Sequence, residues 1–299
     1  MTLDSETVAE IADDLYDALR SGEPIAPPTD DHDMDIEDAY DVQSAFVDRR
    51  LDDGASVVGH KIGLTNDGIQ SQLGVDEPDF GRLLDTMVVE DGVVDSEALL
   101  APRVEPELGF LLAADLAPPV TTLDVLRATE AVVPVVEVID SRVRDWDIGI
   151  EDTVADNASS ALFATGESTH PVEGRDLSLE AVKLYKNGEV VDSGAGAAVL
   201  GHPARAVAWL ANTLEGVDDR LTAGEVVLSG SITPAVDVEA GDVDDGLLGR
   251  GVTQLEFVGD DGALDGDVVG VCDAVVVVVR GGVSLRHHRS PMVSCLRIR

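Results

Sequence analysis

Three acidic residues in two apolar segments have the types and spacing of a metal site. Glu105 and Glu107 lie two residues apart in the segment 104–110, and side chains two apart in a strand point to the same face. Two such carboxylates, about 6–7 Å apart along the strand, repel each other unless a cation lies between them. Glu137, in the apolar segment 135–140, supplies a third carboxylate. Three hard oxygen donors that converge suit a divalent ion such as Mg²⁺ or Mn²⁺; acids alternating on an exposed strand face would have no such role.

Lys61 and Asp79 are the candidates for proton transfer. Lys61 is one of only three lysines and lies between apolar residues just before Gly63, so we expect it to be partly buried. A lysine beside a metal in an apolar pocket has a lowered pKa, which suits proton transfer. It could instead bind a substrate carboxylate or lie on the surface. Asp79, in a predicted turn over 78–81, would pair with Lys61 or relay a proton, although Asp is also common in turns for its hydrogen bonds to the backbone.

Short polar side chains near these segments are candidates for substrate binding. They are Asn157, Ser159, Ser160 and Ser231. Each could orient a carboxylate or an attacking water, and a turn or capping role would explain them equally well. His202, directly before a proline, is expected to be structural.

The composition limits the class of protein. With 299 residues and 44% hydrophobic content, the chain can bury a large core in one broad domain or two. No apolar run has the length of a membrane span, and the acidic N-terminus does not resemble a secretory signal. Two cysteines give neither a disulfide framework nor metal-ligand spacing. We therefore expect a cytoplasmic protein with no membrane partner.

The net charge of −39 argues against a nucleic-acid partner, because no basic surface is available for phosphate groups. High acidity with so few lysines resembles the proteins of extreme halophiles. At molar salt the Debye length falls to about 3 Å, which screens the self-repulsion of such a surface. We expect the fold to depend on high salt.

The hydrophobic periodicity predicts an α+β fold with helices first and strands after. Helices are expected over 3–20, 35–52, 122–131 and 203–214, and strands over 57–62 and 274–279 and in short apolar runs from 88 onward. This pattern divides the chain into an α-rich N-terminal part (1–87), a β-rich catalytic core (88–280) and a basic tail (281–299). The tail has four arginines, two histidines and no acid. We favour a non-native terminus over a segment that docks on an acidic surface.

Seven motifs follow one another along the chain. They are GHKIGLT (59–65), PDFG (78–81), RVEPE (103–107), EVIDSR (137–142), DTVADNASS (152–160), GHP with WLAN (201–212) and LSGSIT (228–233). In this order they resemble the 2-keto-4-pentenoate hydratase family, a branch of the fumarylacetoacetate hydrolase superfamily, over roughly residues 5–270. The family closes on a glycine-bounded strand, where this chain runs into its basic tail.

The resemblance implies a hydro-lyase that converts 2-hydroxypenta-2,4-dienoate to 4-hydroxy-2-oxopentanoate in the meta-cleavage of aromatic compounds. It implies a divalent ion on the three glutamates, a small 2-oxo acid as substrate and a homo-oligomer. A decarboxylase of 4-oxalocrotonate or a hydratase of a longer 2-oxo diacid is the alternative on the same scaffold. Either would need a cation for the distal carboxylate, from Arg82, Arg103 or Arg142. A non-catalytic subunit associated with a pathway decarboxylase is a third interpretation.

Overall fold

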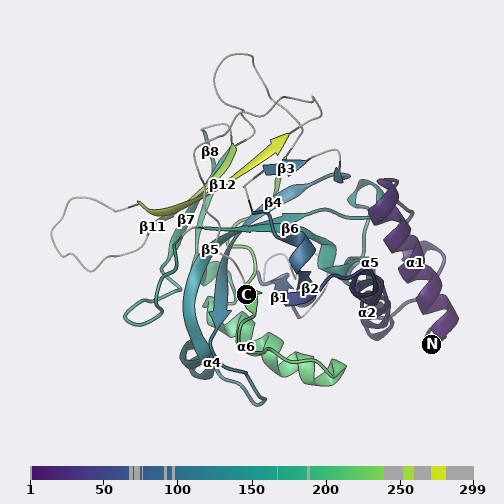
Figure 1. Cartoon of the computed structure of the whole chain (residues 1–299), viewed down its shortest axis with the longest axis horizontal. Helices are drawn as coiled ribbons and strands as arrows, with labels where there is room; N and C mark the ends of the chain where they lie inside the picture. The colour runs from purple at the N-terminus through teal and green to yellow at the C-terminus, as the bar shows by residue number, and fades with distance from the viewer. Residues whose placement is uncertain are drawn as a thin grey trace.

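Two β-sheets and the helices that pack on them form the described part of the chain (Figure 1). The structure is a computed structural model that describes residues 2–66, 70, 75, 77–90, 93–95, 98–166, 168–186, 189–238, 252–258 and 271–280. The helices are α1 (Ser5–Ser21), α2 (Ile36–Asp52), α4 (Thr122–Ala128), α5 (Ile150–Ala155) and α6 (Pro203–Thr213). The strands are β1 (Val57–Gly63), β2 (Asp79–Leu84), β3 (Val93–Asp95), β4 (Arg103–Leu112), β5 (Thr129–Ile139), β6 (Ser160–Thr165), β7 (Ala181–Lys186), β8 (Glu189–Ala195), β9 (Val226–Leu228), β10 (Val236–Asp237), β11 (Val252–Val258) and β12 (Val271–Arg280).

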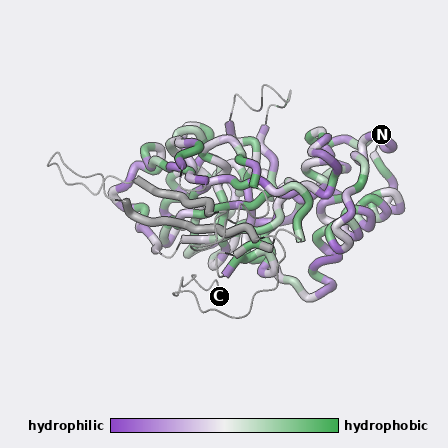
Figure 2. The backbone as a smooth tube through the Cα atoms, turned by 90° about the horizontal axis from the view of Figure 1, so that it is seen from above, coloured by the Kyte–Doolittle hydropathy of each residue, from purple (hydrophilic) through white to green (hydrophobic). Residues whose placement is uncertain are grey.

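The N-terminal helices begin at acidic caps and bury one face. The Asp4 side chain accepts a hydrogen bond from the Thr7 amide at the start of α1, and Asp35 caps α2 in the same way, which satisfies amides that have no partner inside the helix. Leu15 of α1 and Phe46 of α2 are fully buried. Figure 2 shows the N-terminus at one end of the molecule, with hydrophilic and hydrophobic residues alternating along this part. No helix in the described residues is long and apolar enough to span a bilayer.

The seven-stranded sheet has the order β2-β1-β9-β4-β5-β6, with β10 paired to β4. Its longest ladder joins β4 and β5 in antiparallel register and places Glu105 opposite Glu137. β1 pairs with β2 on one side and with β9 on the other, which puts Lys61 in the same sheet. The first two strands of the predicted α-rich part therefore belong to the sheet of the predicted core.

A second sheet has the order β3-β12-β11-β7-β8. The predicted strand 274–279 is confirmed, because it falls within β12. In Figure 1 this sheet lies on the opposite side of the molecule from α1 and α2. Residues 281–299, for which we predict a basic tail, lie outside the described residues.

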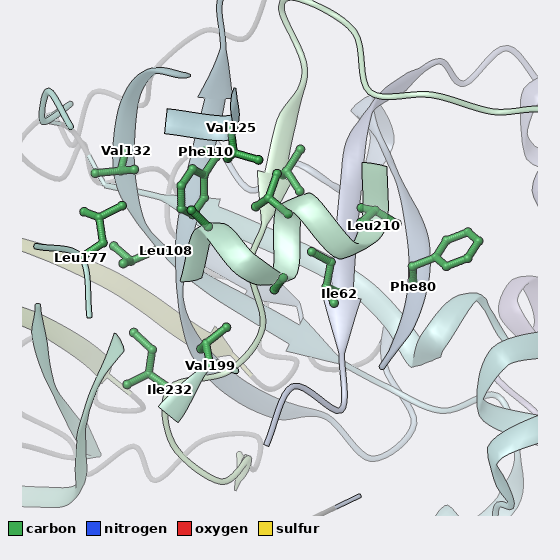
Figure 3. Close-up of a cluster of buried hydrophobic side chains, with 14 of the residues drawn as sticks. Ile62, Phe80, Leu108, Phe110, Val125, Val132, Leu177, Val199, Leu210 and Ile232 are labelled. Atoms are coloured by element: carbon green, nitrogen blue, oxygen red, sulfur yellow. The ribbon is translucent and has the colours of Figure 1, made fainter. Parts of the chain in front are cut away.

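An apolar cluster fills the space between the seven-stranded sheet and α6. Ile62 of β1, Phe110 of β4, Val132 of β5 and Leu210 of α6 are all buried in it, and Figure 3 shows these side chains gathered around the helix. Burial of each large apolar side chain contributes about 1.5–3 kcal/mol. Since side chains alternate along β4, the burial of Phe110 on this face directs Glu105 and Glu107 to the other face.

The α+β prediction is confirmed, two local predictions are wrong, and one helix was missed. Residues 78–81 form no turn, because β2 begins at Asp79 and pairs with β1. α4 ends at Ala128, where β5 continues the chain, so the predicted helix was too long. Helix α5 was not expected, since its six residues are too short to show a hydrophobic period.

His60 forms a buried ionic cluster on the side of β1 opposite Lys61. Its Nδ1 lies 3.2 Å from Glu225 Oε2 and its Nε2 lies 3.4 Å from Asp219 Oδ2. Asp219 also accepts a hydrogen bond from Arg82 Nε at 3.0 Å. Burial alone would lower the pKa of His60, but the hydrogen bonds with the two carboxylates outweigh it and raise the pKa above its ordinary value.

We predict that His60 stabilises the fold most in weakly acidic solution. A histidine whose pKa is raised by folding contributes its full stability below its unfolded pKa of about 6.5 and loses it as the pH rises through the folded value. The gap in unfolding free energy between wild type and His60→Gln should therefore narrow from about pH 6 to pH 9. Urea unfolding of both proteins at constant KCl measures this difference in unfolding free energy. A difference independent of pH would contradict the raised pKa of His60.

Candidate active site

The structure brings the three predicted glutamates together. Glu105 and Glu107 point from β4 to the same face, and Glu137 comes from the facing position of β5. One carboxylate oxygen from each lies within 4.8 Å of the other two. Glu107 and Glu137 are fully buried and Glu105 is half-buried. This is a compact, acidic donor set inside the protein.

Each of the two buried glutamates is held by one oxygen and leaves the other without a hydrogen bond. Glu107 Oε2 accepts from the Gly230 amide at 2.7 Å, and Glu137 Oε1 accepts from Ser160 Oγ at 2.6 Å. Among the described residues, Glu107 Oε1 and Glu137 Oε2 have no hydrogen-bond donor. A buried carboxylate oxygen without a hydrogen bond is costly, so these two oriented oxygens fit a bound divalent cation.

Burial and mutual repulsion keep these acids from ionising easily. Burial is the largest cause of the shift at Glu105, and it raises the pKa of this residue to about 7 although the Lys61 charge opposes it. Burial and the negative charges of Glu137 and Glu105 raise the pKa of Glu107 well above its ordinary value. A cation bound to the cluster would favour the ionised forms, so metal binding would release protons.

Lys61 lies next to the carboxylate cluster. Its Nζ is 3.5 Å from Glu137 Oε2 and donates a hydrogen bond to the Ala158 carbonyl at 3.2 Å. Burial alone would lower the pKa of Lys61, but Glu137, Asp79 and the two β4 glutamates outweigh it and raise the pKa. Without a bound cation the pKa is therefore raised, because four carboxylates act on the ammonium group, and the lowered pKa expected beside a metal stays a prediction.

Asp79 occupies the first position of β2, opposite Gly63 of β1. Its side chain is buried, and its Oδ1 has no hydrogen-bond partner in the described residues. Burial raises the pKa of Asp79, while Lys61 opposes the shift. The structure thus places Asp79 in the electrostatic field of Lys61 with an oxygen available for a proton.

A cavity of about 540 Å³ opens onto this end of the sheet. Lys61, Asp79, Glu105 and Ser159 lie at its polar end. Its other walls are mainly apolar and include Leu64, Ile139, Trp146, Ile148, Ile150 and Ile232. A small molecule with one charged end and one hydrocarbon end fits such a lining.

The predicted substrate-binding residues take different positions. Ser159 lines the cavity, and its buried Oγ has no partner in the described residues. Ser231 also lines the cavity, but its Oγ donates to the Thr233 carbonyl at 2.6 Å. Ser160 holds Glu137. Asn157 turns away from the cavity toward the backbone of β2, so it does not take the predicted contact with substrate. His202 caps α6 by accepting from the Ala204 amide, which confirms its structural role.

Sequence reasoning missed the ionic pair beneath the site. Arg142 is fully buried and is bonded through Nε to Asp156, and its Nη1 donates to the carbonyls of Asp140 and Ser160 at 2.7 and 3.2 Å. An arginine with a buried partner can organise backbone through its fixed set of donors. The available signal was Asp156, an acid among small apolar residues 14 positions from Arg142.

Comparisons with known proteins agree with this geometry. Residues 78–248 match the sequence model of the fumarylacetoacetate (FAA) hydrolase C-terminal family. The chain is 47% identical to 2-hydroxyhexa-2,4-dienoate hydratase of Comamonas testosteroni over 249 residues, 81% of this chain and 94% of that protein. It is also 47% identical to 2-keto-4-pentenoate hydratase of Paraburkholderia xenovorans (strain LB400) over 252 residues, 83% and 94% of the two chains.

The chain belongs to the 2-keto-4-pentenoate hydratase family of the fumarylacetoacetate hydrolase superfamily. The family prediction from the seven motifs is thereby confirmed. A solved structure with this fold is 4-oxalocrotonate decarboxylase from Pseudomonas putida G7, complexed with magnesium and adipate. It superposes with a TM-score of 0.81 at 36% identity, covering 94% of this chain and 99% of that one.

We predict that Glu107→Gln in this hydratase-family chain weakens divalent-metal binding by more than about 10-fold without unfolding the protein. Glutamine can still accept from the Gly230 amide, and the substitution removes a buried, repelled charge. Titration calorimetry with Mn²⁺ measures the affinity, and thermal unfolding without metal checks the fold.

Glu180→Gln is the matched control. Glu180 is a buried acid paired with Arg175 at 3.1 Å and does not belong to the cluster of three glutamates. The Glu180→Gln substitution should leave the Mn²⁺ affinity unchanged. A Glu107→Gln variant that binds Mn²⁺ as tightly as wild type would refute the assignment of this ligand.

Proposed function

We propose that the chain is a divalent-metal-dependent hydratase that adds water to 2-hydroxypenta-2,4-dienoate to give 4-hydroxy-2-oxopentanoate. The observation that carries the proposal is the buried cluster of Glu105, Glu107 and Glu137 beside Lys61 at the polar end of a cavity. Relatives at 46–47% identity are named as hydratases of this kind, which act as hydro-lyases.

The reaction requires a shift of a proton before water can add. The substrate is a dienol carboxylate, and it must become an α,β-unsaturated ketone so that its fourth carbon can accept water. Glu105, Glu107 and Glu137 would hold Mg²⁺ or Mn²⁺, and the bound ion supplies Lewis acidity where negative charge develops on the 2-oxygen. Magnesium accompanies the decarboxylase structure described above, and manganese and pyruvate accompany a more distant fumarylpyruvate hydrolase structure.

Lys61 and Asp79 are placed to move that proton. The proton leaves the 2-hydroxyl and returns to the fifth carbon, so the site needs a group that holds it in between. Asp79 has an unpartnered carboxyl oxygen with a raised pKa, and Lys61 is an ammonium group beside it. Asp79 would relay the proton, and Lys61 would hold the charge that develops.

The remaining polar groups orient the reactants, and the apolar wall holds the hydrocarbon end. Ser159 lines the cavity and its buried hydroxyl has no hydrogen-bond partner in the described residues, so it would serve to contact the substrate carboxylate or the attacking water. Ser160 fixes Glu137. Ser231 would shape the far side of the cavity through its bonded hydroxyl.

The charges around the cavity favour a monocarboxylate over the diacid of a decarboxylase. A relative that is 43% identical is named 4-oxalocrotonate decarboxylase, so the alternative needs a physical test. Of the three arginines considered for a distal carboxylate, Arg142 pairs with Asp156 and Arg82 pairs with Asp219. Arg103 lines the cavity, but it stacks on Trp146 at 4.3 Å, and its Nε donates to Asp237 at 2.9 Å.

From the acidity of the chain and from its family we also propose its cellular location, its salt requirement and its assembly. A net charge of −39 suits a halophilic protein in a cytoplasm of high salt. By analogy with the family, it would form a homo-oligomer and could associate with a decarboxylase of the same pathway. The complete set of glutamates and Lys61 argues against a non-catalytic subunit.

Purified protein with Mg²⁺ or Mn²⁺ in concentrated KCl should remove the dienol absorbance of 2-hydroxypenta-2,4-dienoate and form 4-hydroxy-2-oxopentanoate. Lys61→Ala should lower turnover by about 10²–10⁴-fold with little change in metal affinity. An unchanged dienol absorbance would refute the hydratase. Release of CO₂ from 4-oxalocrotonate, at a higher kcat/KM than that of hydration, would establish the decarboxylase instead.

A further inference from the structure

A left-handed turn connects α5 to β6 beside the catalytic lysine. Its three residues, Asn157, Ala158 and Ser159, have φ angles of 54°, 51° and 51°. Residues other than glycine rarely adopt positive φ, and such conformations persist only where the surroundings impose them. We call these three residues the left-handed turn.

The Asn157 side chain fastens this turn to strand β2. Its Oδ1 accepts a hydrogen bond from the Arg82 amide at 2.8 Å, and its Nδ2 donates to the Arg82 carbonyl at 2.9 Å. The side-chain amide thus pairs with both backbone groups of one strand residue. The neighbouring Gly81 is in close contact, because a Cβ there would lie 2.6 Å from the Asn157 carbonyl oxygen.

The turn delivers groups to the site at successive residues. The Ala158 carbonyl accepts from Lys61 Nζ at 3.2 Å. Ser159 lines the cavity and carries a buried hydroxyl without a hydrogen-bond partner in the described residues, and Ser160, which follows the turn, donates to Glu137 at 2.6 Å. Asn157 is the only one of these residues whose side chain points away from the site, toward β2.

We propose that Asn157 is a positioning residue that sets the place of Lys61 and the Ser159 hydroxyl through the left-handed turn. The role in turnover rests on the proposed hydratase function, whereas the role in placing Lys61 does not. Two hydrogen bonds to Arg82 fix the turn from one side, and the absence of a side chain at Gly81 lets it approach. We call these two hydrogen bonds the Asn157 clamp. Loss of the clamp would release the Ala158 carbonyl from Lys61.

Asn212 provides a matched control, because it binds backbone in the same way and is not among the residues that line the cavity. Its Oδ1 accepts from the Val120 amide at 2.8 Å, and its Nδ2 donates to the Val120 carbonyl at 2.9 Å. Asn157→Ala removes the pair of bonds to Arg82, and Asn212→Ala removes the matching pair to Val120 together with a third bond, from Nδ2 to the Ala208 carbonyl at 2.7 Å. Asn157→Gly removes the pair while allowing the positive φ without strain, and Gly81→Ala places a methyl group against the Asn157 carbonyl oxygen and Oδ1.

Full-length variants are compared in concentrated KCl by steady-state kinetics, Mn²⁺ titration and thermal unfolding. Asn157→Gly and Gly81→Ala should lower kcat by about 100-fold with unchanged Mn²⁺ affinity. Asn212→Ala should lower the melting temperature and leave kcat unchanged. A wild-type kcat in Asn157→Gly, an equal loss of kcat in Asn212→Ala, or failure of every Asn157 and Gly81 variant to fold would overturn the proposal.

A crystal structure of Asn157→Gly supplies a readout that does not depend on turnover. The proposal predicts that Lys61 Nζ no longer bonds the Ala158 carbonyl, and an unchanged Lys61 position would refute it. If wild type is inactive on the dienol, the proposed function fails, and this structure still tests the inference.

Discussion

Four carboxylates around one ammonium group, three buried and one half-buried, are the constraint on which the rest of the site depends. Asp79, Glu105, Glu107 and Glu137 all act on Lys61, and if all were ionised they would exceed its charge by three. Even at the effective dielectric of a protein surface, two like charges 4 Å apart repel by about 4 kcal/mol. Such a cluster needs protons or a cation, and the raised pKa values of Glu105 and Glu107 show that burial favours protons when no cation is bound.

The fold meets this constraint through strand register and backbone donors. The β4–β5 ladder places Glu105 opposite Glu137, and a slip of one residue would turn the β4 glutamates into the apolar cluster around α6. The Gly230 amide and the Ser160 hydroxyl each hold one carboxylate oxygen. Arg142 and Asp156 support the backbone that carries Ser160. The acids are therefore oriented before any ligand arrives, which is the arrangement that metal sites and electrostatic catalysis require.

The parts of the site that could be predicted were those that depend only on residues close together in the sequence. The alternation of a strand puts Glu105 and Glu107 on one face whatever its partners, and the rarity of lysine singled out Lys61. The residue types at 78–81 predicted a turn at Asp79. The pairing of β2 with β1 makes it a strand residue instead, because strand formation depends on tertiary context.

Interactions between distant segments could not be read from the chain. The Asn157 clamp joins residues 75 positions apart, and nothing in the sequence near Asn157 specifies Arg82 as its partner. The direction of the pKa shift of Lys61 also depended on distant residues, since only the folded chain shows how many carboxylates surround it. The family motifs located Asn157 near the site, and the structure gave it a different contact.

The most direct test of the central claim is X-ray diffraction from crystals grown with Mn²⁺ and measured at the manganese absorption edge. We expect one anomalous peak coordinated by carboxylate oxygens of Glu105, Glu107 and Glu137, with Lys61 beside Glu137. Manganese bound elsewhere, or no peak at these three residues at saturating Mn²⁺, would contradict it.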